Sequence, residues 1–377
     1  MRLAVWVFVT IAAAFGSESQ GVRFGPGVCG PIDPAYIQTA TETGGQPFPL
    51  STAEVGKSSR IMGSSLVREL LLWASGSMEY LYSIPIDSTV ARMMVSGTFD
   101  ATGGALTLTA PDGTVIRQGD RIEDTLLNCG RIITVDAPAS GSWQVRVSPT
   151  GRFWLKVNAK SGLSLTNAGF LEHDSAPESN RFVKIQGEPI AGKPATLRVQ
   201  LSSAIKSPTF QFVSVDSRPL QDVDLQSTDA GEFTGAVALP AEPFRVVVKG
   251  SDQSDRPVQR VWHGLFHAEV IEVIPPAGEQ TVTAGSEMSV TFTIRNHGPA
   301  VRLRLVASDQ RGKVIAVEPA TLELGAGAES TATVRWSMPP DMPANAEASI
   351  RLTVNSDPAA AIGGFNSAAK TFTVIRK

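Results

Sequence analysis

The stretch GSWQVRVSPTGRFWLKV at residues 141–157 contains the clearest strand–turn–strand signal in the chain. Apolar and polar residues alternate on both sides of a Pro-Thr-Gly turn at 149–151, so the stretch predicts a β-hairpin. Similar short alternating runs begin at Ser77 and recur to the C-terminus, separated by turns such as Pro-Asp-Gly at 111–113. We therefore expect a mainly β protein of tandem antiparallel β-sandwiches, preceded by a short α/β stub.

The composition agrees with this fold class. The chain has 377 residues, enough for two or three domains, and 34 Gly with 25 Pro suits a turn-rich β-protein. Its 42 % hydrophobic residues exclude wholesale disorder. The 33 Lys and Arg do not exceed the 36 Asp and Glu, which argues against nucleic acid as a partner.

The first 16 residues have the pattern of a secretory signal peptide. Arg2 provides positive charge, an apolar run covers 3–15, and small residues at Ala14 and Gly16 provide a cleavage site. Such a run is shorter than the ~20 residues that cross a bilayer, although an uncleaved anchor is the alternative. We expect no later membrane span and a secreted, extracellular protein.

The two cysteines, Cys29 and Cys129, have no metal-binding spacing. In an oxidising compartment they would form one disulfide across 100 residues of chain. Two buried free thiols are the alternative.

The N-terminal region has helical character. Residues 35–43 predict a helix that ends at Gly44 and Gly45. A second helix of about five turns is predicted from one apolar stripe, which we expect to pack on the following sandwich or on a second protein molecule. The stripe consists of Val55, Met62, Leu66, Leu70 and Trp73.

Composition shifts predict the domain boundaries. A polar segment at 166–181 reads as a linker, and Pro-Pro-Ala-Gly at 275–278 marks a second boundary. The predicted parts are a signal peptide over 1–16, an α/β stub over 17–75, a β-sandwich over 76–165, an immunoglobulin-like β-domain over 182–274 and an immunoglobulin-like sandwich over 275–377.

Several stretches resemble hemicentin-type extracellular proteins. Residues 28–55, including TETGG at 41–45, are similar to the C-terminal end of a von Willebrand factor A domain. GRFWLKVNAKSGLS at 151–164 resembles the galactose-binding-like sandwich that follows that domain. TAGSEMSVTFTIRNHGP at 283–299 looks like the opening strands of an immunoglobulin-like module. The resemblance implies a non-catalytic extracellular matrix or adhesion-type scaffold that acts through protein–protein contacts or self-association.

The metal site of that domain family does not carry over. Metal-binding A domains begin with Asp-x-Ser-x-Ser, whereas the nearest match here, at 87–91, is Asp-Ser-Thr-Val-Ala. His263 and His267 are four apart, but on a strand they would lie about 13 Å apart. The acidic run with Asp222, Asp224, Asp229 and Glu232 lacks calcium-loop spacing, and a solvated turn is the better interpretation. We expect no metal and no cofactor.

Catalytic signatures are equally scarce. The sequence contains no Gly-x-Ser-x-Gly elbow and no phosphate-binding loop, so we expect no enzyme. Alternation places Trp154 opposite the packing face of its strand, where it could stack on a ligand or lie under a neighbouring element. Two alternatives therefore stay open: an array of carbohydrate-binding modules, and the non-catalytic part of a secreted hydrolase.

Overall fold

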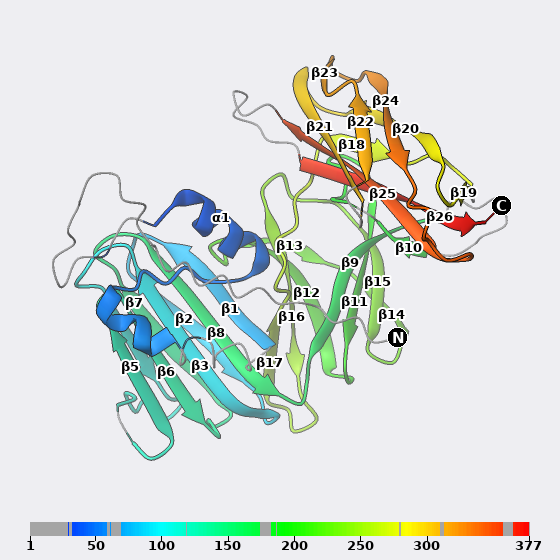
Figure 1. The fold of residues 1–377 in the computed structure, drawn as a ribbon. Coiled ribbons are helices and arrows are strands. Elements are labelled where there is room, and N and C mark those ends of the chain that lie inside the picture. The colour runs from blue at the N-terminus through cyan, green and yellow to red at the C-terminus, as the bar shows by residue number, and fades with distance from the viewer. Residues whose placement is uncertain are drawn as a thin grey trace. The chain divides into compact units, whose positions relative to one another are not determined.

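The computed structural model describes residues 29, 32–58, 61, 69–117, 119–173, 182–185, 187–278, 280–309, 313–356 and 365–376. Strands dominate these residues, which confirms the predicted mainly β fold (Figure 1). The predicted signal peptide lies outside the described residues. The chain divides into two compact units. The first comprises 1–168, 198–235 and 243–266, and the second comprises 169–197, 236–242 and 267–377.

A nine-stranded antiparallel sheet and a three-stranded sheet form the first unit. The larger sheet has the order β13 (Pro219–Val223), β12 (Lys206–Ser214), β16 (Phe244–Ser251), β17 (Pro257–Val261), β1 (Glu69–Gly76), β8 (Phe153–Ser161), β3 (Val90–Phe99), β6 (Gly130–Asp136) and β5 (Ile122–Leu127). The smaller sheet has the order β2 (Tyr80–Ile86), β7 (Gly141–Ser148) and β4 (Ala105–Thr109). Their facing apolar side chains form one core, with Trp143, Val145 and Leu155 almost fully buried.

The strands of the predicted hairpin at 141–157 are present, but they do not pair with each other. β7 belongs to the three-stranded sheet and β8 to the nine-stranded sheet. The turn between them therefore crosses from one layer of the sandwich to the other. Both strands have an apolar face, and those faces meet across the core instead of lying side by side in one sheet. Alternation alone does not distinguish these two arrangements.

The prediction of a second helix is wrong at its C-terminal end, where the structure describes a strand. Leu70 and Trp73 lie on strand β1, which is buried on both faces. The run ELLLWASG is a continuous apolar stretch, as expected of a strand in the middle of a sheet, and its spacing of three only imitates a helix. Val55 lies on the 3₁₀ helix η1 (Thr52–Lys57), and Met62 and Leu66 lie outside the described residues.

The first predicted helix is confirmed as α1 (Pro34–Thr43). Asp33 caps its N-terminus by accepting a hydrogen bond from the Ala35 N–H at 2.9 Å. Gly44 ends it with a left-handed backbone (φ 68°), and a Cβ there would lie 2.4 Å from the His263 carbonyl oxygen. Only glycine fits this close approach.

The nine-stranded sheet does not respect the predicted boundaries at 75/76 and 166–181. Strand β1 pairs with β8 along most of its length and with β17 at Leu70 and Val261. Strands from before residue 76 and after residue 181 are thus built into the same sheet as β3 and β8.

A further sheet has the order β10 (Phe182–Lys184), β9 (Leu165–His173), β11 (Ala195–Leu201), β15 (Glu232–Val237) and β14 (Gln226–Asp229). Strands β9, β11 and β15 have residues in both units.

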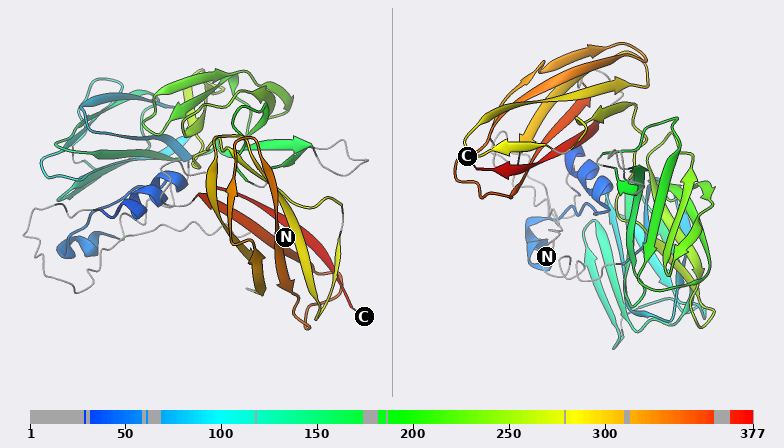
Figure 2. Two further views of the ribbon diagram at one scale, coloured as in Figure 1. Left: turned by 90° about the horizontal axis from the view of Figure 1, so that it is seen from above. Right: turned by 90° about the vertical axis from the view of Figure 1, so that its right-hand side faces the viewer.

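The second unit contains an immunoglobulin-like sandwich, visible as two layers in Figure 2. One layer is β18 (Ile271–Ile274), β20 (Glu287–Asn296), β24 (Glu329–Ser337) and β22 (Val314–Glu318). The other is β19 (Thr281–Thr283), β26 (Phe365–Ile375), β25 (Glu347–Ser356), β21 (Val301–Asp309) and β23 (Thr321–Leu324). β19 pairs in parallel with β26. Trp336 and Phe372 pack in the core with ring centroids 5.5 Å apart, so this sandwich is closed by packing without a disulfide.

Candidate interaction surface

The predicted disulfide is formed. Cys29 and Cys129 are bonded, with their Cα atoms 5.7 Å apart. Cys129 lies in the turn between β5 and β6, so the bond ties the N-terminal segment to the nine-stranded sheet.

Gln46 fastens the same segment to the face of this sheet that is turned away from the sandwich core. Its Nε2 donates to the carbonyl oxygens of Trp154 at 2.8 Å and Ser96 at 3.0 Å, and lies 3.2 Å from the Thr98 hydroxyl. Its Oε1 accepts from the Ser96 hydroxyl at 2.5 Å. The chain after α1 is thus part of the folded unit.

Two residues of the predicted apolar stripe, and the residue predicted to stack on a ligand or lie under a neighbouring element, are core residues. Leu70, Trp73 and Trp154 are each about 1 % exposed and belong to one apolar cluster with Val213, Val247 and Val261. Trp154 therefore lies under a neighbouring element and is not available for stacking on a ligand. Of the other members of the apolar stripe, Val55 is exposed, at 48 %.

Two largely buried cationic side chains, Arg245 and Lys156, lie near the apolar cluster of Trp73 and Trp154. The Arg245 guanidinium lies 4.8 Å above the Trp73 ring and donates to the carbonyl oxygens of His263 at 3.1 Å and of Thr41. It therefore neutralises the C-terminal end of α1, where the helix dipole is negative. Burial lowers the pKa of Arg245 to about 10. Burial, with the nearby charge of Arg245, lowers the pKa of Lys156 to about 8.

Three large exposed apolar side chains of the first unit gather at strand β2. Met78 is 80 % exposed, Tyr80 57 % and Leu81 44 %. β2 is at the edge of its sheet, and among the described strands it pairs only with β7. We call residues 78–82 the β2 edge.

Aromatic rings anchor the β2 edge to the sandwich core. The ring centroids of Tyr80 and Tyr82 lie 4.5 Å apart, and Tyr82 packs edge-on against Phe153 at 6.5 Å. Burial raises the pKa of Tyr82, so its hydroxyl stays neutral. The exposed Tyr80 ring is thus connected through Tyr82 to the buried ring of Phe153.

The β2 edge carries no unpaired charge. Glu79 is the one charged residue in 77–86. Its carboxylate accepts from the Arg146 guanidinium at 2.6 Å and from the Ser148 hydroxyl at 3.0 Å, and these two bonds lower its pKa. Natural edge strands are usually guarded by a charge or a proline, and here the proline, Pro85, stands beyond the exposed half of β2. The exposed half is therefore unguarded.

Sequence reasoning missed this edge. A signal was present, because SMEYLYSIPI at 77–86 alternates and contains a proline, which confines a strand to a sheet edge.

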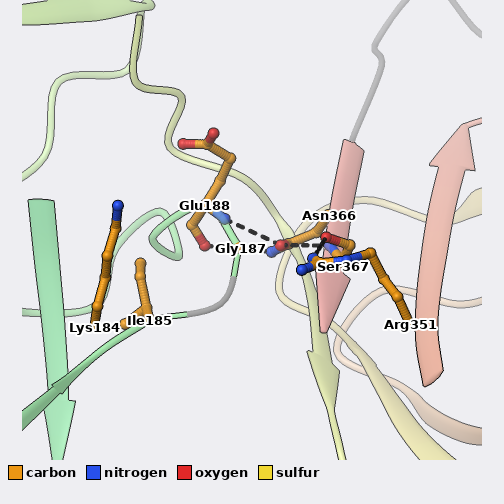
Figure 3. Close-up of a pocket in the computed structure, with 7 residues that line it drawn as sticks. All are labelled: Lys184, Ile185, Gly187, Glu188, Arg351, Asn366 and Ser367. Atoms are coloured by element: carbon orange, nitrogen blue, oxygen red, sulfur yellow. Dashed lines mark hydrogen bonds between the residues drawn. The ribbon is translucent and has the colours of Figure 1, made fainter. Parts of the chain in front are cut away.

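The second unit has a polar cavity of about 320 Å³, shown in Figure 3. It is lined by Lys184, Ile185, Gly187, Glu188, Arg351, Asn366 and Ser367. Buried Asn366 joins its two sides: the amide nitrogen donates to the carbonyl oxygens of Ile271 at 2.7 Å and Glu188 at 3.3 Å, and Oδ1 accepts the Glu188 N–H at 3.1 Å. The Glu188 carboxylate points away from Asn366 and accepts the His267 N–H at 3.2 Å. The polar groups of Asn366 at this cavity are thus occupied by hydrogen bonds within the chain.

The remaining candidate ligands do not converge. In the part of the chain that the structure describes, no three His, Cys, Asp or Glu side chains come close enough to hold a metal ion. Asp222 and Asp224 instead accept hydrogen bonds from the neighbouring amides of Gln211 and Gln226. None of the described helices is long and apolar enough to cross a membrane.

Comparisons with known proteins give one weak sequence similarity. No family model matches the chain. It is 22 % identical over 262 residues to hemicentin-1 of Mus musculus and of Homo sapiens, which covers 66 % of this chain but only 4 % of each relative.

Similarity to solved structures is distant. Fibronectin(III)-like modules of Clostridium thermocellum CbhA match at 13 % identity and a TM-score of 0.18, covering 55 % of this chain and 94 % of theirs. A Bacillus licheniformis lipase in propeptide form matches at 10 % identity and a TM-score of 0.26, covering 68 % of this chain and 43 % of its own. Scores this low carry no argument about function. The predicted A-domain tail over 17–75 gains no support from these similarities. The similarity to hemicentin-1, the immunoglobulin-like sandwich and the disulfide together support an extracellular protein of immunoglobulin-like type.

Proposed function

We propose that this chain is a secreted, non-catalytic scaffold of the extracellular matrix or of cell adhesion, and that it works through protein–protein contacts. The observation that carries the proposal is the β2 edge, where Met78, Tyr80 and Leu81 are exposed on an unguarded strand. Exposed apolar edges of this kind are templates for pairing with another chain. The Cys29–Cys129 disulfide is consistent with an oxidising compartment.

The module organisation belongs to the same proposal. Residues 1–16 would be a signal peptide, 17–75 would correspond to the tail of a von Willebrand A domain, and 76–165 to the core of a galactose-binding-like sandwich. The similarity to a short part of hemicentin-1 supports an extracellular protein of this type, and the order of modules rests on the resemblances in the sequence. The resemblance supplies no metal ligands, so contacts through this chain would need no bound cation.

A carbohydrate-binding array is the weaker alternative. Sugar platforms need exposed aromatic rings that lie in one plane. The Tyr80 and Tyr82 rings are tilted by 43° to each other, and Trp154 is buried. The remaining exposed surface of the β2 edge, from Met78 and Leu81, is aliphatic and suits a polypeptide partner better than a sugar.

The other alternative, the non-catalytic part of a secreted hydrolase, is also less well supported. Such a part would place two carboxylates, or a serine and a histidine, in one cavity. Among the described residues that line the 320 Å³ cavity, Glu188 is the sole carboxylate, and its Oε2 is held by the His267 backbone.

The test uses the full chain coupled to beads and a cell-deposited extracellular matrix as the probe. A Met78→Ser, Leu81→Lys double variant should reduce bead retention at least tenfold, because it removes apolar area and adds an edge charge. Leu126→Lys is the matched control, since Leu126 is an exposed leucine on the edge strand β5, and it should leave retention unchanged.

Enzymatic pretreatment of the matrix separates the two classes of partner. Trypsin treatment should abolish retention, whereas removal of matrix glycans should not. Retention that survives trypsin and is lost with the glycans would overturn the proposal in favour of carbohydrate binding.

A further inference from the structure

We infer that the partner of the β2 edge is a second copy of this chain, paired β2 to β2 in antiparallel orientation. The inference rests on the proposed function, because it assumes that the β2 edge is the contact site, and it adds the identity of the partner.

A two-fold axis perpendicular to the strand at Tyr80 would bring the same edge of two copies together. Met78 then lies opposite Tyr82 of the second copy, and Glu79 lies opposite Leu81 of the second copy. Tyr80 lies opposite its own counterpart. Antiparallel pairing is what such an axis imposes on two identical strands, so the edge is self-complementary in direction.

Charge also favours a second copy. Because Arg146 already neutralises Glu79 at 2.6 Å within one chain, the axis brings no unpaired like charges together. An acidic or a basic partner strand would find no complementary charge on the β2 edge. An uncharged apolar strand needs none. The β2 edge itself is such a strand, and the net charge of −3 gives only weak long-range repulsion between copies.

Strand β5, the edge strand with the exposed Leu126, is protected against pairing with another strand. Strand β5 carries Glu123, and the Lys57 ammonium group donates to the Leu126 carbonyl oxygen at 2.7 Å. Charged residues and an occupied backbone acceptor are the usual devices against strand addition. The contrast between the two edges indicates that β2 is left open for a contact.

The contact would be weak in one pair of molecules. Five paired residues span about 17 Å, and the buried area falls in the transient class, below ~1,200 Å². For a transient contact of this kind we expect a dissociation constant on the order of 100 µM. Many copies held on one surface would bind far more tightly through avidity, as an adhesion scaffold requires.

Sedimentation equilibrium and cysteine cross-linking of the full chain test the inference together. The average mass of the wild type should rise above the monomer value as concentration increases towards the millimolar range. Leu81→Glu should remain a monomer, because it places a carboxylate opposite Glu79 of the second copy. Tyr80→Cys should form a cross-linked dimer under mild oxidation, because paired strands hold opposite Cα atoms 4.5–5.5 Å apart, within disulfide range. Both native cysteines are already bonded, so they do not compete. Leu126→Cys should cross-link at least tenfold more slowly.

A wild type that stays monomeric, with equal cross-linking of the two cysteine variants, would overturn self-pairing. If matrix retention still depended on the β2 edge in that case, the proposed function would stand with a different protein as the partner. If retention were also independent of the edge, both proposals would fall. Unchanged thermal unfolding of Leu81→Glu excludes misfolding as the cause of its monomeric state.

Discussion

Replacing Gln46 measures how firmly the N-terminal segment is bound to the nine-stranded sheet. Gln46 is 9 % exposed and connects this segment to Ser96 and Trp154 through its amide group. Gln46→Ala removes two donated hydrogen bonds and one accepted bond, each worth about 1 kcal/mol. It also removes about one buried methylene, worth about 0.8 kcal/mol. We expect the free energy of unfolding to fall by about 2–4 kcal/mol.

Urea denaturation followed by tryptophan fluorescence is the assay, because Trp73 and Trp154 lie in the same region. Gln46→Met keeps most of the side-chain volume and should still cost about 2 kcal/mol, since the hydroxyl and carbonyl partners lose their bonds. Gln144→Ala, on the exposed face of β7, is the matched control and should change stability by less than about 0.5 kcal/mol. A loss below about 0.5 kcal/mol in both Gln46 variants would refute the packing of this segment on the sheet.

Three other expected outcomes concern the first unit. Trp143→Ala should lower the unfolding free energy by about 3–5 kcal/mol, since the ring is 2 % exposed in the sandwich core; a loss under about 1 kcal/mol in urea denaturation would place it at the surface. Replacing Cys29 and Cys129 together by serine should cost about 4–5 kcal/mol from the 100-residue separation, and titration of the unfolded, unreduced wild type should find no thiol. Burial and the charge of Arg245 lower the pKa of Lys156 from 10.5 to about 8, so the unfolded chain binds more protons between these pH values and stability should rise with pH across them. Lys156→Met should abolish that rise in urea titrations, and an identical pH profile for the variant would contradict the assignment.

Local chemistry predicted several elements well. The helix now seen at Pro34–Thr43 was readable because Gly44 supplies the left-handed residue that ends it. The disulfide was readable because only two cysteines occur, and the predicted signal peptide pointed to an oxidising compartment. Strand positions from Ser77 onwards followed the alternation of apolar residues, which depends on neighbours along the chain alone.

Pairing partners could not be predicted in the same way. The alternation in β7 and β8 fixes which face of each strand is apolar, but two sheets that face each other and two strands of one sheet require the same pattern. For the same reason Trp154 was assigned to an outer face, although residues 32–58 cover that face and Gln46 binds the Trp154 carbonyl. The run at 69–76 is buried on both sides, so its periodicity carried no information about helix or strand.

The β2 edge is exposed because, among the described strands, no second strand of its sheet lies beside β2, and the sequence does not show which strands are neighbours. Met78, Tyr80 and Leu81 would be ordinary strand residues if another strand lay beside β2. Only the sheet order, with β2 at one end, makes them a surface. Pro85 was the one local sign that this strand belongs at an edge.

Hydrogen exchange measured as a function of protein concentration tests the central claim most directly. If two copies pair through β2, the backbone N–H groups at residues 78–82 that face outwards should exchange more slowly as concentration rises, while the exposed edge strand β5 keeps its rates. With a dissociation constant on the order of 100 µM, exchange at β2 should slow several-fold between about 10 µM and about 1 mM. Rates at β2 that do not change over this range, or slowing confined to another strand, would contradict the assignment of β2 as the contact between copies.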